Sequence, residues 1–453
     1  MTYLRKFLHN KIYLGSALAA VLLLSIGGGY LLLAKNSANP KTNSASSSSA
    51  QKETQGGSRM GDPNSTDPVE KGKALSGGNC SGTGSKKLNS APMRIKDISY
   101  IQPYGLLAGP HVTPIDHGYY WGKVPFGDPD LYDVLALSDG KIVNIGYRDR
   151  SGEGRKVKGD YRVVISYSCT FFSYFDLATS LDPAIRRQLP KDWEKADNKV
   201  VNTDINIKEG QVLAKFGGQS LDFAVWDTTK QLKNLLVPTA YNNAEPWKIN
   251  TVNPLEYFSD SVKSQILPFY LRKVEPLDGV IDQDIDGKAA GNWFAEGTNG
   301  YAGVFSYGSA GGGQNNYWAG HLALVHDLYE PSGWVFSIGN LNGEAKQFGI
   351  KAPSPTPDKL EIASGLVKYE IGAWQHVETN GNVWLGKAFP TGGLKMKVGN
   401  SQGTVLVQLL EKRKLKIEVF LNKTPSQVSG FTSAARIYDR GDNAKMIKSN
   451  TAT

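Results

Sequence analysis

Residues 12–34 carry no charged side chain, and this stretch constrains the fate of the chain more than any other feature of the sequence. A helix of about 23 residues, rising ~1.5 Å per residue, spans the roughly 30 Å hydrocarbon layer of a bilayer. Arg5, Lys6 and Lys11 precede the stretch, so the positive-inside tendency keeps residues 1–11 in the cytoplasm. The sequence predicts a single-pass plasma-membrane protein whose bulk lies outside the cytoplasm. A cleaved signal peptide is the alternative, but no clean Ala-x-Ala site follows.

The segment after this helix, residues 35–90, is rich in Ser, Asn, Gly and Pro. Such a composition buries too little apolar surface to offset the entropy lost on ordering. We therefore expect a disordered, flexible spacer that holds the rest of the chain clear of the membrane.

Strand-length apolar runs separated by turn residues fill the rest of the chain, which contains 50 glycines and 21 tyrosines. Glycine permits tight turns and aromatic residues fit pleated surfaces, so the pattern favours a mainly β protein. A chain of 453 residues exceeds what one hydrophobic core usually serves. We expect an antiparallel β domain at 91–274, a second β-sandwich or barrel at 275–440, and a flexible tail at 441–453.

Three local patterns refine the first domain. The alternation on both sides of Asp139-Gly140 predicts a β-hairpin. Pro183, one residue after a capping Asp182, predicts the start of a helical insertion, and residues 251–271 contain one more short helix.

Charge and cysteine content limit the partners of the chain. The formal net charge is +9, which favours anionic lipid headgroups or acidic wall polymers. No basic run with interleaved aromatic residues is present, which argues against nucleic acid. Cys80 and Cys169 are the only cysteines, and a single disulfide or two free thiols both remain open.

Five landmarks in residues 105–227 carry a resemblance to a known family. They are His117-Gly118, DVLALSDGKIVNI, YRVVISYSCTFFSYFDL, IKEGQVLAKFGG and SLDFAVWD. Their order resembles that of the lysostaphin/LytM-type zinc endopeptidases, which cut peptidoglycan cross-links. The resemblance implies a β domain like the family's duplicated hybrid motif and a function at the cell wall.

The departures from the family's motifs concern the zinc ligands. The family binds zinc through the His and Asp of His-x-x-x-Asp and the last His of His-x-His. Here His117 remains, but Trp121 stands at the aspartate position and Asp222 at the last histidine. Asp176 replaces the histidine of the family's Tyr-x-His-Leu motif. Because a catalytic zinc needs three good ligands, the resemblance implies a degenerate domain, a pseudoenzyme that binds peptidoglycan or an envelope partner.

A non-standard site is the alternative, in which the protein is an active metallohydrolase. His111, His117, Asp176 and Asp222 are its candidate zinc ligands, with His117 and Asp176 as candidate catalytic residues. Candidate substrate contacts beside this site are Tyr119 and Tyr174.

Two further patterns lie near the start of the second domain. Asp282, Asp284, Asp286 and Gly287 match the opening of a calcium-binding loop, but Trp293 stands where the bidentate Glu belongs, which favours a solvated turn. Trp293 and Trp318 belong to an aromatic cluster, which either packs in a core or offers sugars a stacking platform. The platform corresponds to a third function, that of a glycan-binding or adhesive surface protein.

Overall fold

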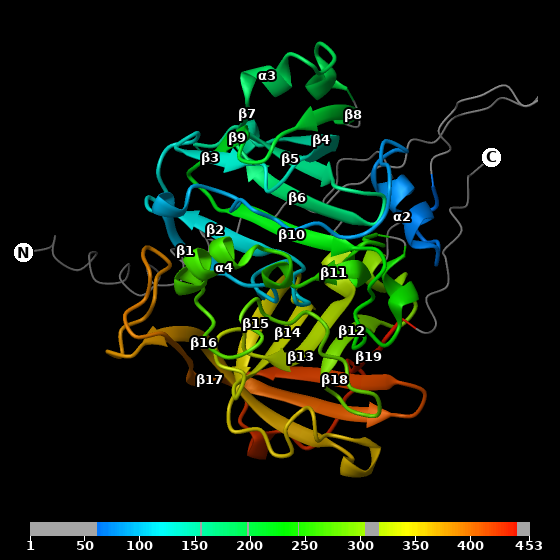
Figure 1. Cartoon of the computed structure of the whole chain (residues 1–453). Helices are drawn as coiled ribbons and strands as arrows, with labels where there is room; N and C mark the ends of the chain where they lie inside the picture. The colour runs from blue at the N-terminus through cyan, green and yellow to red at the C-terminus, as the bar shows by residue number, and fades with distance from the viewer. Residues whose placement is uncertain (1–60, 155, 197–198, 243, 304–316, 442–453) are drawn as a thin grey trace, which may run out of the picture.

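The computed structural model describes residues 61–154, 156–196, 199–242, 244–303 and 317–441. It is mainly β, with an open antiparallel sheet, a small sheet and a closed eight-stranded barrel (Figure 1). The predicted membrane helix at 12–34, the cytoplasmic residues 1–11 and almost all of the predicted tail lie outside the described residues. Within the described ranges, no helix combines the length and the hydropathy needed to cross a bilayer.

The open sheet forms the first domain and is antiparallel throughout. Its strands, in spatial order, are β1 (Ile98–Gln102), β2 (Gly118–Gly122), β10 (Leu221–Asp227), β6 (Phe171–Ala178), β5 (Gly159–Ser166), β4 (Gly140–Asp149) and β8 (Val200–Ile207), with β11 (Thr251–Val252) beside β10. Phe175 and Phe223 point from neighbouring strands into the main core. Because side chains alternate along a strand, Asp176 and Asp222 point to the opposite face.

A second, three-stranded sheet corrects the predicted hairpin. It consists of β3 (Tyr132–Leu135), β9 (Val212–Phe216) and β7 (Ser180–Leu181), in the order β3-β9-β7. The two runs beside Asp139-Gly140 therefore belong to different sheets, and the hairpin prediction is wrong. The Asp139 carboxylate instead accepts hydrogen bonds from the Lys208 ammonium and the Glu209 backbone N–H. The turn thus bends the chain from one sheet into the next.

The two helices expected in the first domain are present. Helix α3 (Pro183–Arg186) begins after Asp182, whose side chain accepts the Ala184 N–H as an N-cap should. Helix α4 (Asp260–Ile266) buries Val262 and Ile266.

Residues 61–90 are folded, so the predicted spacer is wrong for this part. Helix α2 (Pro68–Leu75) is capped by Asp67. A disulfide joins Cys80 to Cys169, and Leu88 is fully buried in the main core. Gly72 explains how closely α2 docks, since a Cβ there would lie 1.7 Å from the Cys169 carbonyl oxygen. A polar composition did not prevent order because the segment gains its apolar contacts from the sheet.

The second domain is a barrel, one of the two forms expected. Its strands are β12 (Gly291–Ala295), β13 (His321–His326), β14 (Trp334–Leu341), β15 (Glu344–Ile350), β16 (Val367–Glu378), β17 (Leu394–Leu410), β18 (Lys414–Leu421) and β19 (Arg436–Asp439). Pairing of Phe294 with Asp439 and of Ala295 with Tyr438 closes the ring. The interior is filled by side chains such as Trp293, Phe336 and Tyr438.

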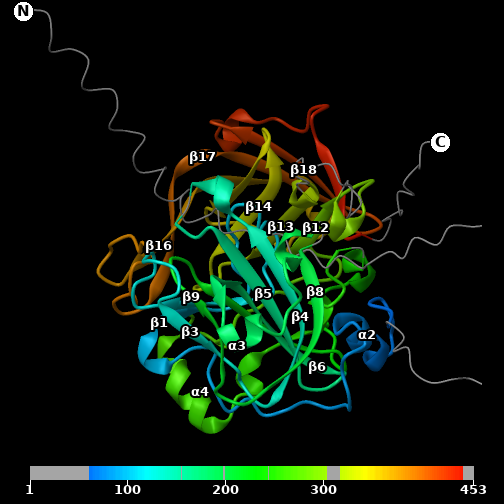
Figure 2. The same ribbon diagram turned by 90° about the horizontal axis from the view of Figure 1, so that it is seen from above.

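The open sheet and the barrel pack directly against each other. Figure 1 shows them as two stacked bodies, and in Figures 1 and 2 helices α2 and α4 lie on opposite sides of the sheet. Gln347 of the barrel exchanges two hydrogen bonds with the backbone of Gly109, at 3.0 and 2.9 Å. Tyr100 of β1 donates to the Gly386 carbonyl in the loop between β16 and β17.

Candidate functional site

The residues singled out by the family resemblance gather on three adjacent strands. Asp222 on β10 lies opposite Asp176 on β6 and opposite Tyr119 on β2. His117 immediately precedes β2. The sheet therefore brings together positions that are up to about 100 residues apart in the sequence.

His117 is the centre of this cluster and is almost fully buried. Its Nε2 lies 3.3 Å from Asp222 Oδ2, and its Nδ1 lies 2.8 Å from the Tyr174 hydroxyl and 3.7 Å from Asp116 Oδ1. Burial alone lowers the pKa of His117, but the Asp222 and Asp116 carboxylates outweigh it and raise the pKa to about 9. His117 is therefore an imidazolium cation at neutral pH, held between carboxylates.

His111 lies beside His117, with 5.9 Å between the ring centroids. Loss of solvent around the ring and the positive charge of His117 lower the pKa of His111 to about 3. Its Nδ1 is buried without a hydrogen-bond partner among the described residues. His111 and Asp222 thus both lie beside His117, with the His111 imidazole neutral and the His117 imidazole charged.

Asp176, the fourth candidate, is held by two arginines. Arg148 and Arg162 each donate two hydrogen bonds to its carboxylate. Burial raises the pKa of Asp176, but the two guanidinium groups more than reverse this and hold it well below its usual range. An ionised carboxylate saturated by two cations is a poor general base.

Further charged residues complete the cluster, and the family motifs gave no sign of them. Buried Lys248 lies 3.3 Å from Asp116 and 3.9 Å from Glu245, and its ammonium sits 5.0 Å from the centroid of the Tyr301 ring. Lys248 begins the single 3-10 turn Lys248–Asn250, which is too short to show a periodic pattern in the sequence. Arg162 had a readable signal, because it is a charged residue directly before the apolar run Val163–Ile165 of β5.

The zinc site implied by the resemblance does not fit these residues. His117 Nδ1 lies within hydrogen-bond distance of the Tyr174 hydroxyl, and Nε2 lies 3.3 Å from Asp222 Oδ2 without meeting hydrogen-bond geometry. The Asp176 carboxylate is occupied by the two arginines. Over the described part of the chain, no three His, Cys, Asp or Glu side chains are grouped so that they could hold a metal ion.

The two candidate tyrosines line the cluster. Tyr174 is fully engaged through its hydroxyl with His117. Tyr119 packs edge-on against the His117 ring at 5.0 Å, and its buried hydroxyl has no hydrogen-bond partner among the described residues. Both tyrosines are buried, Tyr119 at 6% exposure and Tyr174 at 2%, so neither presents its ring to a polymer at the surface.

The two aromatic candidates in the barrel, Trp293 and Trp318, lie in different surroundings. Trp293 is fully buried, donates to the Ala289 carbonyl and packs under the Arg440 guanidinium at 4.0 Å, so it cannot stack on a sugar. Its selection as a substrate contact is wrong, because the strand turns it into the barrel interior. Trp318 is half-buried against Tyr317 and stays a prediction.

The acidic turn at 282–287 does not form a common oxygen cage. Asp282 accepts the Asn234 N–H, and Asp286 pairs with Arg413. Asp284 accepts the Asn292 and Leu236 N–H groups and lies 3.0 Å from Arg440. The three carboxylates therefore serve to fix the entry into the barrel.

Comparison with known proteins adds little to this description. No protein-family model matches the chain, and no curated protein matches it. Among solved structures, the solution structure of lysostaphin aligns with 79% of this chain and 92% of its own, at 10% identity and a TM-score of 0.22. A TM-score of that size carries no argument about fold or activity.

Proposed function

We propose that this chain is a membrane-anchored protein of the cell envelope whose first domain is a degenerate LytM-type peptidase domain. In this proposal the domain binds peptidoglycan or an envelope partner and does not hydrolyse it. The proposal rests on the order of the sequence landmarks in residues 105–227 together with the ion pairs that occupy the ligand positions.

The observation that carries the non-catalytic part is the state of Asp176 and His117. Arg148 and Arg162 neutralise Asp176, and His117 is itself a cation between Asp116 and Asp222. A divalent cation at this place would meet buried positive charges at close range, which is unfavourable in a medium of low dielectric constant. The charges of the cluster compensate one another without a metal.

Two observations support a location outside the cytoplasm. The Cys80–Cys169 disulfide is of the kind that persists in oxidising compartments. The uncharged residues 12–34 follow a basic N-terminus, and the formal charge of +9 favours anionic wall polymers.

The test is a sedimentation assay with purified full-length chain and insoluble peptidoglycan sacculi. We expect the chain to pellet with the sacculi, to release no soluble muropeptides, and to behave identically with and without a chelator.

Zinc analysis of the same preparation tests the alternative, an active metallohydrolase. Stoichiometric zinc, with muropeptide release that the chelator and His117→Ala both abolish, would replace this proposal by the metallohydrolase. Failure to pellet with sacculi, with no release, would remove the wall as the ligand.

A further inference from the structure

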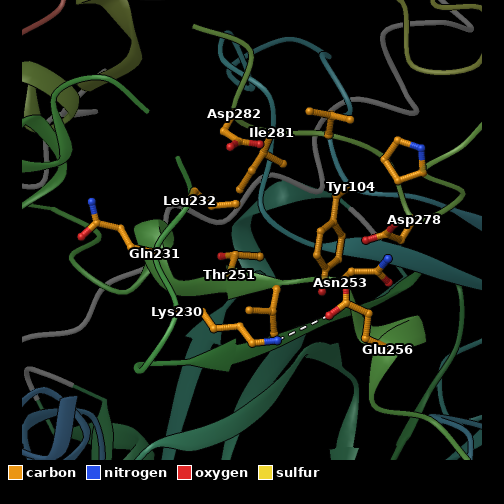
Figure 3. Close-up of a pocket in the computed structure, with 14 residues that line it drawn as sticks. Tyr104, Lys230, Gln231, Leu232, Thr251, Asn253, Glu256, Asp278, Ile281 and Asp282 are labelled. Carbon is orange, nitrogen blue, oxygen red and sulfur yellow. Dashed lines mark hydrogen bonds and ion pairs between the residues drawn. The ribbon is translucent and has the colours of Figure 1, made fainter. Parts of the chain in front are cut away.

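A cavity of about 380 Å³ opens where β11 meets the segment that leads into the barrel, away from the His117 cluster. Its volume falls within the range of small-molecule sites. Figure 3 shows its lining, which combines side chains from β11, the following loop and residues 276–282. The polar or aromatic lining residues that matter here are Tyr104, Lys230, Thr251, Glu256, Asp278 and Asp282.

Two polar atoms in this lining are buried and unsatisfied. Asp278 is 4% exposed and Thr251 is 3% exposed. Asp278 Oδ1 and Thr251 Oγ1 have no hydrogen-bond partner among the described residues. In Figure 3 the Asp278 carboxyl group points toward the Tyr104 ring, within the circle of lining side chains. Buried polar atoms in native proteins nearly always have partners, so these two atoms can accept a hydrogen bond from a bound water or from a ligand that replaces it.

The charges around the cavity indicate whether the ligand is a cation or an anion. Lys230 lies at the rim, where its ammonium is 3.4 Å from Glu256 and 4.9 Å from the centroid of the Tyr257 ring. The carboxylates of Asp278 and Asp282 have no ammonium or guanidinium group within ion-pair distance among the described residues. A ligand that brings a positive charge is therefore favoured over an anion.

We infer that this cavity binds a small organic molecule through a primary ammonium group, which donates to Asp278 Oδ1 and packs against the face of Tyr104. Thr251 Oγ1 supplies a second hydrogen bond to the ammonium or to a neighbouring hydroxyl of the ligand. This site is independent of the envelope function proposed above.

An organic ammonium fits the cavity better than a metal ion does. Calcium takes six to eight oxygen ligands, and the cavity presents its carboxylates singly. An ammonium group has three donors and is also attracted by the negative face of an aromatic ring, which Tyr104 provides. The cavity volume leaves room for the rest of an amino sugar or an amino acid.

The pKa of Asp278 makes the proposed ligand binding depend on pH. Burial raises the pKa of Asp278 to about 7, so near neutrality the free site is partly protonated. Since only the carboxylate attracts an ammonium group, binding should strengthen as pH rises from 6 to 8. The titratable or charged groups that face this carboxyl are Tyr104, Glu256, Tyr270, Arg272 and Glu275.

The experiment is isothermal titration calorimetry of the full-length chain with two amines, glucosamine and L-lysinamide. The matched probes are N-acetylglucosamine and diacetylated lysinamide, which keep the shape of each molecule and lose the charge. We expect at least one of the amines to bind and its acetylated form to bind roughly 10- to 100-fold more weakly. The affinity for L-lysinamide, whose side-chain ammonium keeps its proton throughout this window, should rise between pH 6 and pH 8.

Two variants assign the binding to the cavity. Asp278→Asn keeps the size of the side chain and should weaken amine binding by a similar factor, and Thr251→Val should weaken it less. Asp286→Asn, outside the cavity, should bind like the parent chain. Circular dichroism identifies any variant that fails to fold. The inference is overturned if neither amine binds the parent chain, if acetylated probes bind equally well, or if both folded cavity variants bind unchanged.

Discussion

Around His117, single charged residues decide what the site can do. Arg148 connects Asp160 and Asp176, and Arg150 also donates to Asp160. Buried ions of this kind are expensive to desolvate, and the remaining partners are destabilised when one is removed. The cluster thus behaves as one unit in which each carboxylate is matched by a neighbouring cation.

The first prediction concerns Asp176. Asp176→Ala should lower the free energy of unfolding by about 3–5 kcal/mol, because it leaves Arg148 and Arg162 buried without this partner. Urea unfolding at pH 7 measures the change. As a control, Asp204→Ala removes a partner of Lys141 in a pair whose carboxylate is 57% exposed, and should cost about 1 kcal/mol or less. Equal costs for the two variants would show that the cluster is not electrostatically coupled.

The second prediction concerns the pH dependence that His117 imposes. Its pKa is raised from 6.5 to about 9, so between these values the folded state binds more protons than the unfolded state. Stability from His117 is therefore complete below pH 6.5 and is lost as pH rises through about 9, by up to about 3 kcal/mol. His117→Gln should flatten the urea-unfolding profile in this window.

His111 provides the matched control for that measurement. Its pKa is lowered to about 3, so its protonation makes stability rise with pH between about 3 and 6.5 and has no effect above. His111→Gln should leave the alkaline slope intact. If the alkaline slope persists in His117→Gln, another titrating group causes it.

Residue types alone predicted part of the site around His117 and missed the rest. His117 and Asp222 lie close together because β2 and β10 are neighbours in the sheet, and both residues had been singled out from the order of the landmarks in residues 105–227. The role of Asp176 was not, since its partners Arg148 and Arg162 come from two other strands whose register no motif encodes. Trp293 was misassigned because an aromatic residue in a strand reads the same whether it faces the interior or the solvent.

At the scale of elements, sequence patterns identified strands better than their pairing. The barrel followed from strand-length runs with turns between them, and helices α3 and α4 followed from caps and periodicity. The Asp139-Gly140 turn misled because a turn signal fixes a change of direction and does not fix the partner strand. Helix α2 was missed because its stability comes from the disulfide nearby and from contacts with β6 and with the second apolar cluster, where Leu75 joins Phe172 and Trp226.

The third prediction tests that attachment of α2. The disulfide joins residues 89 positions apart, so it restricts the unfolded chain strongly. Cys80→Ser combined with Cys169→Ser should lower the free energy of unfolding by about 2–5 kcal/mol. Thermal denaturation measures the loss, and a mobility shift on reduction of the parent chain reports the bond. A parent chain with two thiols that react freely with alkylating reagent under native conditions would contradict this account.

At the scale of the whole molecule, the open sheet and the barrel share their packing. Tyr241 contacts the rings of Phe294 and Tyr301, and its hydroxyl accepts a hydrogen bond from Asn292. On the other side of the interface, Gln102 of β1 donates to the Tyr329 hydroxyl. Two domains joined by buried aromatic residues should not unfold independently.

The fourth prediction follows from this shared packing. Calorimetry should show one unfolding transition, and Tyr241→Ala should shift it as a whole, with a cost of about 3–5 kcal/mol. Leu385→Ala, 57% exposed in the loop between β16 and β17, should change stability by about 0.5 kcal/mol or less. Two separate endotherms, of which Tyr241→Ala shifts only one, would show that the domains are thermodynamically independent.

The closure of the barrel has a consequence for the order of biosynthesis. Strand β12 pairs with β19, so residues 294–295 have no partner on this side until residues 438–439 have been synthesised and the ring can close. Whichever machinery delivers this polypeptide in N-to-C direction, the open sheet emerges early, while β12 emerges with one lateral edge still unpaired. Loss of the last strand by premature termination would leave that edge exposed permanently, which makes such shortened products natural substrates for quality-control proteases.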